Sequence, residues 1–214
     1  LPGVSRDEID KFTAQHQVGT RHPVIGMVTR FAAEKGVEIL LDALPYVLEK
    51  HPHAQVLFAG QHENVLGEKP YHDRLMPRIR EFEKGNYWKF LGNLGQEQLA
   101  AFYPNIDALV VPSLNSTEAF GLVQVEAMMQ GIPCVASNLP GVRRPVQMHG
   151  MGEVIPIGDS RALAEALLKI FTRQSSNTSD RSDLVKQYAP GNIAREFEEL
   201  FIRLKQSHRN ARTG

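Results

Sequence analysis

The sequence predicts an α/β fold, in which helices cover both faces of a parallel sheet of about six strands. Two observations support this prediction. Short apolar runs alternate with segments of helical periodicity along the whole chain, and glycine or proline separates many of them. The segment 110–136 shows the unit most clearly, because an apolar run, a polar loop, a helical pattern and a second apolar run follow one another. A strand–helix–strand unit of this kind joins parallel strands.

The first half of the chain supplies three predicted strands and the helices around them. Ser5 and Glu8 have the spacing of a capping box, which starts a short helix. The apolar runs 24–29, 55–59 and 87–91 predict strands. Leucine and valine at helical spacing predict a long helix after Gly36, which Pro45 interrupts, and further helices are expected at 71–84 and 96–103.

The second half continues the alternation. Strands are expected at 108–111, 132–136 and 153–157, and helices at 121–131, just after Gly141, and after a cap at Asp159. A serine-rich polar segment, 174–182, predicts a mobile loop, and 192–206 predicts an amphipathic helix. We therefore divide the chain into an interdomain linker at 1–22, an α/β domain at 23–173, and a mobile loop with a C-terminal helix at 174–214.

The composition of the chain limits the classes of function that it can have. With 214 residues, 42% of them hydrophobic, the chain can bury a large core. The 24 lysines and arginines balance the 24 aspartates and glutamates. The chain therefore has no net positive charge that would favour nucleic acid as its partner. No apolar run approaches the ~20 residues that span a bilayer, and a cytoplasmic location is expected. Cys134, the single cysteine, excludes an internal disulfide and is interpreted as a buried apolar side chain.

Candidate functional residues follow the strands. The carboxyl ends of parallel strands meet at one edge of a sheet, which brings together the loops 30–36, 92–95 and 113–121. Arg30 and Lys35 supply positive charge, and a helix that begins at Gly121 offers free backbone N–H groups to a phosphate. Glu118 and Glu126 supply acceptors for hydroxyl groups. This set of groups suits a sugar diphosphate.

These residues also carry a family resemblance. The first matching segment, which follows a predicted strand, is Arg30-x4-Lys35-Gly36. The later matching segments are, in chain order, Pro112-Ser113, Glu118-Ala-Phe-Gly-Leu-Val-Gln-Val-Glu126, Gly131-Ile-Pro-Cys-Val-Ala and Pro140-Gly-Val. Over residues 1–173 this pattern resembles the retaining nucleotide-sugar glycosyltransferases of family 4. The resemblance implies the Rossmann-like, donor-binding C-terminal half of the two-domain GT-B fold, with the final helix similar to the terminal helix of that family.

The resemblance implies a role for each matching residue. Arg30 and Lys35 would neutralise the diphosphate, and Glu118 would contact the donor sugar, so these three are the expected catalytic residues. Glu126 would accept hydrogen bonds from the ribose hydroxyls. The other expected donor contacts are Thr29, Gly60, Asn93, Leu94, Ser113, Ala119, Phe120, Gly121, Leu122 and Val123. Family members need no metal and no cofactor, and His51 and His53 lack a further ligand at metal spacing.

Two positions depart from the family pattern. Thr29 stands where the family usually has glycine, which would narrow the approach to the donor. Arg144 stands where glutamate is common. The arginine either removes a sugar contact, adds a positive charge for an acidic donor, or is a simple surface substitution.

The resemblance implies a function that needs more than this chain. The expected protein is a retaining glycosyltransferase that moves a hexose-type sugar from a UDP-, GDP- or ADP-sugar to an acceptor on a missing N-terminal domain. This chain alone is expected to be inactive, because the cleft that aligns both substrates needs both walls. Peripheral contact with the inner membrane face is left open, through the missing domain only.

Two other functions stay open. One is a GT-B-type nucleotide-sugar epimerase, whose product would be an altered sugar without an acceptor. The other is a nucleotide-sugar-binding module without catalysis. Dinucleotide-dependent oxidoreduction is disfavoured, because no G-x-G-x-x-G follows the first strand.

Overall fold

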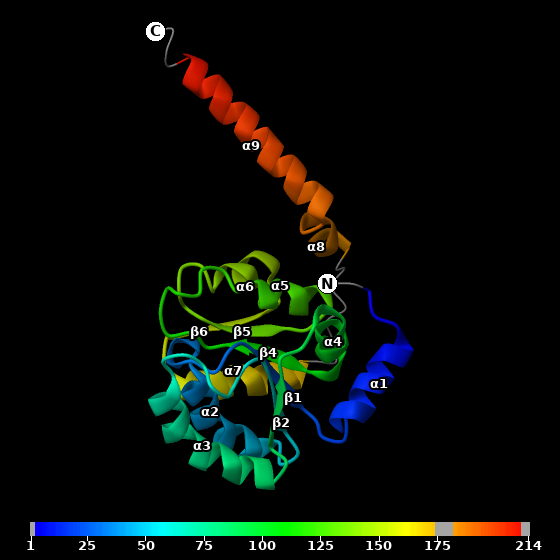
Figure 1. Cartoon of the computed structure of the whole chain (residues 1–214), viewed down its shortest axis with the longest axis vertical. Coiled ribbons are helices and arrows are strands. Elements are labelled where there is room, and N and C mark those ends of the chain that lie inside the picture. Colours follow the sequence, from blue (N-terminus) through cyan, green and yellow to red (C-terminus); the bar gives the residue numbers. More distant parts are fainter. Residues whose placement is uncertain (1–2, 174–181, 211–214) are drawn as a thin grey trace. The chain divides into compact units, whose positions relative to one another are not determined.

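The computed structural model describes residues 3–173 and 182–210, which belong to two compact units that divide near residue 177 (Figure 1). The first unit is an α/β domain, and the second consists of two helices.

The first unit is built on one sheet of six parallel strands, in the order β3-β2-β1-β4-β5-β6. The strands are β1 (Val24–Val28), β2 (Gln55–Ala59), β3 (Trp88–Gly92), β4 (Ala108–Val111), β5 (Cys134–Ser137) and β6 (Gly152–Ile155). The predicted fold class is therefore confirmed. The direction of strand addition reverses between β1 and β4, and in such sheets ligands bind at this point, beyond the carboxyl ends of the strands.

The strands follow the apolar runs because both faces of the sheet are covered. All five residues of β2 and all four of β4 and β5 are buried. Several boundaries differ from the prediction, and two of these differences are small: β1 ends at Val28 and not at residue 29, and β6 begins at Gly152 and not at residue 153. Pro133 has no N–H to donate, so β5 begins at Cys134 and not at residue 132, and β6 ends at Ile155 because Pro156 follows it. The third strand is shifted by one residue, to 88–92.

Helices form a layer on each face of the sheet (Figure 1). One layer contains α2 (Val37–Lys50), α3 (Lys69–Lys84) and α7 (Ser160–Arg173), and α2 packs directly against α7. The other contains α4 (Gln96–Phe102), the short 3-10 helix η2 (Tyr103–Asn105), α5 (Leu122–Met129) and α6 (Arg144–His149). The α2 helix continues through Pro45, and Asp159 caps α7 as predicted, with its Oδ1 atom 2.8 Å from the backbone nitrogen of Ala162.

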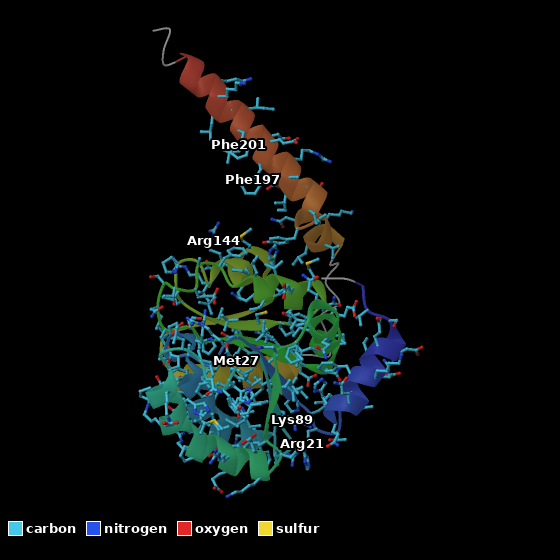
Figure 2. The ribbon with its side chains drawn as sticks, viewed as in Figure 1. Arg21, Met27, Lys89, Arg144, Phe197 and Phe201 are labelled. Carbon is cyan, nitrogen blue, oxygen red and sulfur yellow. The ribbon has the colours of Figure 1, made fainter. Side chains whose placement is uncertain are left out.

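The leading segment begins with α1 (Arg6–His16), which has the predicted capping box between Ser5 and Glu8. The buried Phe12 of this helix meets Phe102 of α4 edge-on, with ring centroids 6.5 Å apart. Beyond the helix, Arg21 donates to the carbonyl of Gly85 at 2.8 Å, and Lys89 belongs to the edge strand β3 (both are labelled in Figure 2). Lys89 donates to the carbonyl of His16, which fastens the end of α1 to this strand.

The second unit contains α8 (Ser182–Gln187) and α9 (Pro190–Asn210). The α9 helix begins earlier and ends later than the predicted 192–206, and Phe197 and Phe201 lie along one side of it (Figure 2). The loop predicted at 174–182 lies, apart from its last residue, outside the described residues. No helix among the described residues is long and apolar enough to cross a membrane.

Candidate functional site

The loops after β1 and β4 are in direct contact at the carboxyl edge of the sheet. Gly36 has a φ of +70°, and a Cβ atom built on it would lie 2.1 Å from the carbonyl oxygen of Pro112. Only glycine therefore permits this approach without strain. The backbone N–H of Leu114 donates to the carbonyl of Glu34 at 2.9 Å, which ties the two loops together a second time. Lys35 is thereby fixed beside the loop that carries Glu118.

Lys35 and Glu118 form an ion pair in this place. The lysine Nζ lies 2.7 Å from Oε2 of Glu118, and the two side chains are only 15% and 25% exposed. The other carboxylate oxygen, Oε1, accepts from the backbone N–H of Gly121 at 3.1 Å, where α5 begins. One carboxylate thus spans a cation and a helix N-terminus, the two kinds of group that bind phosphate.

The surrounding cleft is narrow. It has a volume of about 10 Å³, roughly the space that one water molecule needs. Its lining residues are Met27, Val28, Thr29, Lys35, Val110, Val111, Pro112, Ser113, Glu118 and Val123. The cleft beside Lys35 and Glu118 thus has room for no group larger than a water molecule.

Arg30, the second predicted cation, is more exposed. Its side chain is 53% accessible, and its guanidinium pairs with the carboxylate of Glu34, which is only 13% accessible. The sequence did not single out Glu34, whose backbone and side chain both take part in this loop. Each predicted cation is thus paired with a glutamate.

Glu126 is held differently. It lies in the second turn of α5 and is partly buried, and its Oε2 atom accepts from the hydroxyl of Tyr103 at 2.8 Å. Tyr103 is fully buried in η2. Burial, and then the negative charge of Glu126, raise the pKa of the Tyr103 hydroxyl, so it stays a hydrogen-bond donor. Sequence reasoning missed Tyr103, because an aromatic residue before a strand has the pattern of an ordinary core residue.

Four other predicted contact residues lie at the ends of β1, β2 and β3. The Thr29 N–H donates to the carbonyl of Ala59, and the Gly60 N–H donates to the carbonyl of Gly92 at 2.7 Å. Asn93 and Leu94 follow directly, the first exposed and the second partly buried. Thr29, Gly60 and the 93–94 segment therefore border the same edge as Lys35.

The rest of the predicted set surrounds the start of α5. Ser113 is buried, Ala119 and Leu122 are exposed, and Phe120 and Val123 are partly buried. The first N–H groups of an α-helix have no partner within the helix, so the backbone of 121–123 offers donors here.

The segment before α6 packs against this loop. A Cβ atom on Gly141 would lie 1.7 Å from the carbonyl oxygen of Ala119, and the buried Gln124 donates to the carbonyl of Val142 at 2.9 Å. Arg144 comes from the first turn of α6 and is exposed, on the side of the unit that carries α5 and α6 (Figure 2). Within the described part of the chain, no acidic residue forms an ion pair with it.

The histidines and the cysteine form no metal site in the described part of the chain. In residues 3–173 and 182–210, no group of three or more histidine, cysteine, aspartate or glutamate side chains could hold a metal ion. His51 instead packs edge-on against Phe171, with ring centroids 5.5 Å apart. Cys134 is buried as predicted, and burial raises the pKa of its thiol, which disfavours the reactive thiolate.

Sequence comparison finds relatives over most of the chain. The family described as "Glycosyl transferases group 1" matches residues 8–189. The chain is 35% identical over 139 residues to a phosphatidyl-myo-inositol mannosyltransferase of Mycobacterium leprae, which covers 64% of this chain and 34% of that protein. It is 28% identical over 220 residues to a D-inositol 3-phosphate glycosyltransferase of Corynebacterium urealyticum, covering 96% of this chain and 50% of that protein.

Structure comparison also finds a similar protein. The crystal structure of Alr3699/HepE from Anabaena in complex with UDP and glucose superimposes with a TM-score of 0.75 and 25% sequence identity. The superposition covers 93% of this chain and 53% of that one. The chain thus spans half or less of the curated relatives named above, and about half of this structural neighbour.

Proposed function

The chain belongs to the glycosyl transferases group 1 family, with the α/β fold of its GT-B neighbours, and we propose that it is the donor-binding part of a retaining glycosyltransferase. The proposed reaction moves a hexose-type sugar from a nucleoside diphosphate to an acceptor. One observation carries the proposal: the Glu118 carboxylate bridges Lys35 and the N-terminus of α5. A carboxylate that lies between a cation and a helix N-terminus occupies a ready-made anion site.

The diphosphate of the donor takes the place of this carboxylate. Lys35 and the N–H groups of residues 121–123 then bind the phosphate oxygens, and Arg30 adds a second positive charge. Negative charge grows on the diphosphate as the sugar leaves, so these groups stabilise the transition state more than the bound donor. Removal of one hydrogen-bonding group that stabilises such a charge typically lowers the rate by ~10²- to 10³-fold. Two cations and a helix N-terminus supply this charge, so the proposal includes no metal and no cofactor.

The two glutamates bind the sugar and the ribose, the uncharged parts of the donor. Once replaced by the diphosphate, the Glu118 carboxylate is available to hydroxyl groups of the sugar, while Glu126 accepts from the ribose. Thr29, Gly60, Asn93 and Leu94 border the ribose and the base. The Anabaena neighbour, whose structure contains UDP and glucose, supports a nucleotide sugar as the donor.

The acceptor belongs to another part of the protein. Because the chain spans only part of its relatives, we place the acceptor on a missing N-terminal domain. The 214-residue chain then binds nucleotide without significant transfer, since positioning of both substrates supplies much of the rate.

A calorimetric titration of this chain with UDP, GDP and ADP tests the proposal. We expect one nucleotide to bind at micromolar to submillimolar concentration, and an Arg30→Ala, Lys35→Ala double variant to lose at least tenfold in affinity. The matched control is Arg161→Ala, Lys169→Ala, which removes two ion-paired cations from α7 and should bind normally. If no nucleotide binds, or if both double variants lose affinity equally, the proposal is wrong.

A further inference from the structure

Tyr103 is a buried polar residue to which the proposed reaction gives no role. Its hydroxyl lies within hydrogen-bond distance of the Val123 carbonyl and of the Glu126 carboxylate, and the carboxylate is the closer of the two. We propose that Tyr103 is a positioning residue that holds Glu126 toward the ribose hydroxyls of the bound nucleotide. This inference rests on the proposed function, because it takes the ribose as the partner of Glu126.

The geometry fixes the tyrosine against α5. Its hydroxyl lies 2.8 Å from Oε2 of Glu126 and 3.3 Å from the carbonyl oxygen of Val123, so both acceptors lie on one turn of α5. A phenol has a single hydrogen to donate. The shorter distance and the charge of the carboxylate both favour Glu126 as its acceptor. The ring cannot move away, because Tyr103 is fully buried and packs against Phe102 with centroids 5.6 Å apart.

The bond leaves Glu126 able to bind a ligand. Among the described residues, Oε1 of Glu126 accepts no hydrogen bond, and Oε2 keeps one further lone pair beyond the bond from Tyr103. Two carboxylate oxygens with acceptor capacity left, one of them held by Tyr103, suit the two adjacent hydroxyls of a ribose. Without Tyr103, the glutamate would sample several rotamers, and ordering it again would oppose binding.

The Tyr103 hydroxyl, which donates this hydrogen bond, also stays protonated. Burial and the negative charge of Glu126 both oppose ionisation of the Tyr103 hydroxyl. The hydrogen bond therefore persists at any pH at which the carboxylate is charged and the protein is folded.

Tyr71 provides a matched control. It is nearly as buried as Tyr103, at 7% exposed, but its hydroxyl accepts from the backbone N–H of Glu38 at 3.1 Å. Tyr71→Phe removes a buried, hydrogen-bonded hydroxyl from the same domain without touching Glu126. It measures the purely structural cost of such a change.

The test compares the affinities for UDP and 2′-deoxy-UDP in the 214-residue chain. We expect Tyr103→Phe to weaken UDP binding by about five- to tenfold and 2′-deoxy-UDP binding by only about two- to threefold, because 2′-deoxy-UDP keeps one of the two hydroxyls, so the preference for ribose shrinks. Tyr71→Phe should leave this preference unchanged. A Tyr103→Phe variant that keeps the preference of the wild-type protein would overturn the inference.

A Glu126→Gln variant separates this inference from the proposed function. If Glu126→Gln keeps the ribose preference, the role of Glu126 itself is wrong and Tyr103 has nothing to position. If the chain binds none of UDP, GDP and ADP, the proposed function is wrong. If Glu126→Gln loses the preference and Tyr103→Phe does not, only the inference about Tyr103 fails. If both are right, Tyr103→Phe has no further effect on the preference in the Glu126→Gln background.

Discussion

Glu118 and Glu126 belong to one strand–loop–helix unit, but the protein holds them in opposite ways. Glu118 lies in the loop, where its carboxylate contacts the amine of Lys35 and the N–H of Gly121. Glu126 lies in α5, where a neutral, fully buried tyrosine holds it. The partners of Glu118 attract any anion, whereas Tyr103 has no positive charge with which to attract one.

We infer from this difference which glutamate a ligand displaces. A diphosphate carries more negative charge than a carboxylate and can take both partners of Glu118. It cannot take the single hydrogen of Tyr103, which is buried and already donated. We therefore interpret Glu118 as the exchangeable acid of the site and Glu126 as the fixed one, although both occur in one motif.

The largest expected effect comes from a substitution at Gly36, where the loop that carries Lys35 contacts the loop that carries Glu118. Gly36→Ala would place a Cβ atom 2.1 Å from the carbonyl oxygen of Pro112, in a residue with a φ of +70°. We expect a loss of roughly 2–4 kcal/mol in the free energy of unfolding, measured by urea denaturation. Gly67→Ala is the control, since Gly67 has a φ of +81° but no atom within 4 Å, and should cost about 1 kcal/mol. Equal losses would show that the Gly36 contact does not matter.

The next largest effect is expected at the cation that Glu118 holds. Lys35→Ala should weaken UDP binding by about 10- to 100-fold, because a partly buried charge–charge hydrogen bond to the diphosphate is lost. Arg30→Ala should cost less, since the Arg30 side chain is 53% exposed and solvent screens its charge.

Lys169→Ala is the control for the loss of a lysine, because Lys169 lies on α7 and pairs with Glu153 at 2.6 Å. Calorimetry would measure all three variants. If Lys35→Ala binds UDP as well as Lys169→Ala does, Lys35 has no part in phosphate binding.

Much of the fold could be predicted because parallel strands buried on both faces are continuous apolar runs. The runs at β2 and β4 were placed at the correct residues. The errors at β5 and β6 arose at Pro133 and Pro156, where an apolar run continues but a hydrogen-bonded ladder cannot.

The candidate site was predictable only in part. Strand-end loops could be expected to meet at one edge, so Lys35 and Glu118 could be placed near each other. Their pairing joins residues 83 positions apart, and no local pattern specifies it. Tyr103 gave no signal at all, because the bond to Glu126 depends on how η2 packs against α5. Arg144 has no explanation in the structure beyond its exposed position beside the loop.

One measurement tests the exchange of Glu118 most directly, namely the affinity of a Glu118→Gln variant for UDP. Glutamine keeps an acceptor for the Gly121 N–H but places no negative charge on Lys35, so the diphosphate no longer competes with a carboxylate. Free UDP lacks the transferred hexose that Glu118 is proposed to contact, so no favourable contact is lost. We expect Glu118→Gln to bind UDP about three- to tenfold more tightly than the wild-type chain. Weaker binding by Glu118→Gln would contradict the account, because it would make Glu118 a partner of the diphosphate rather than its competitor.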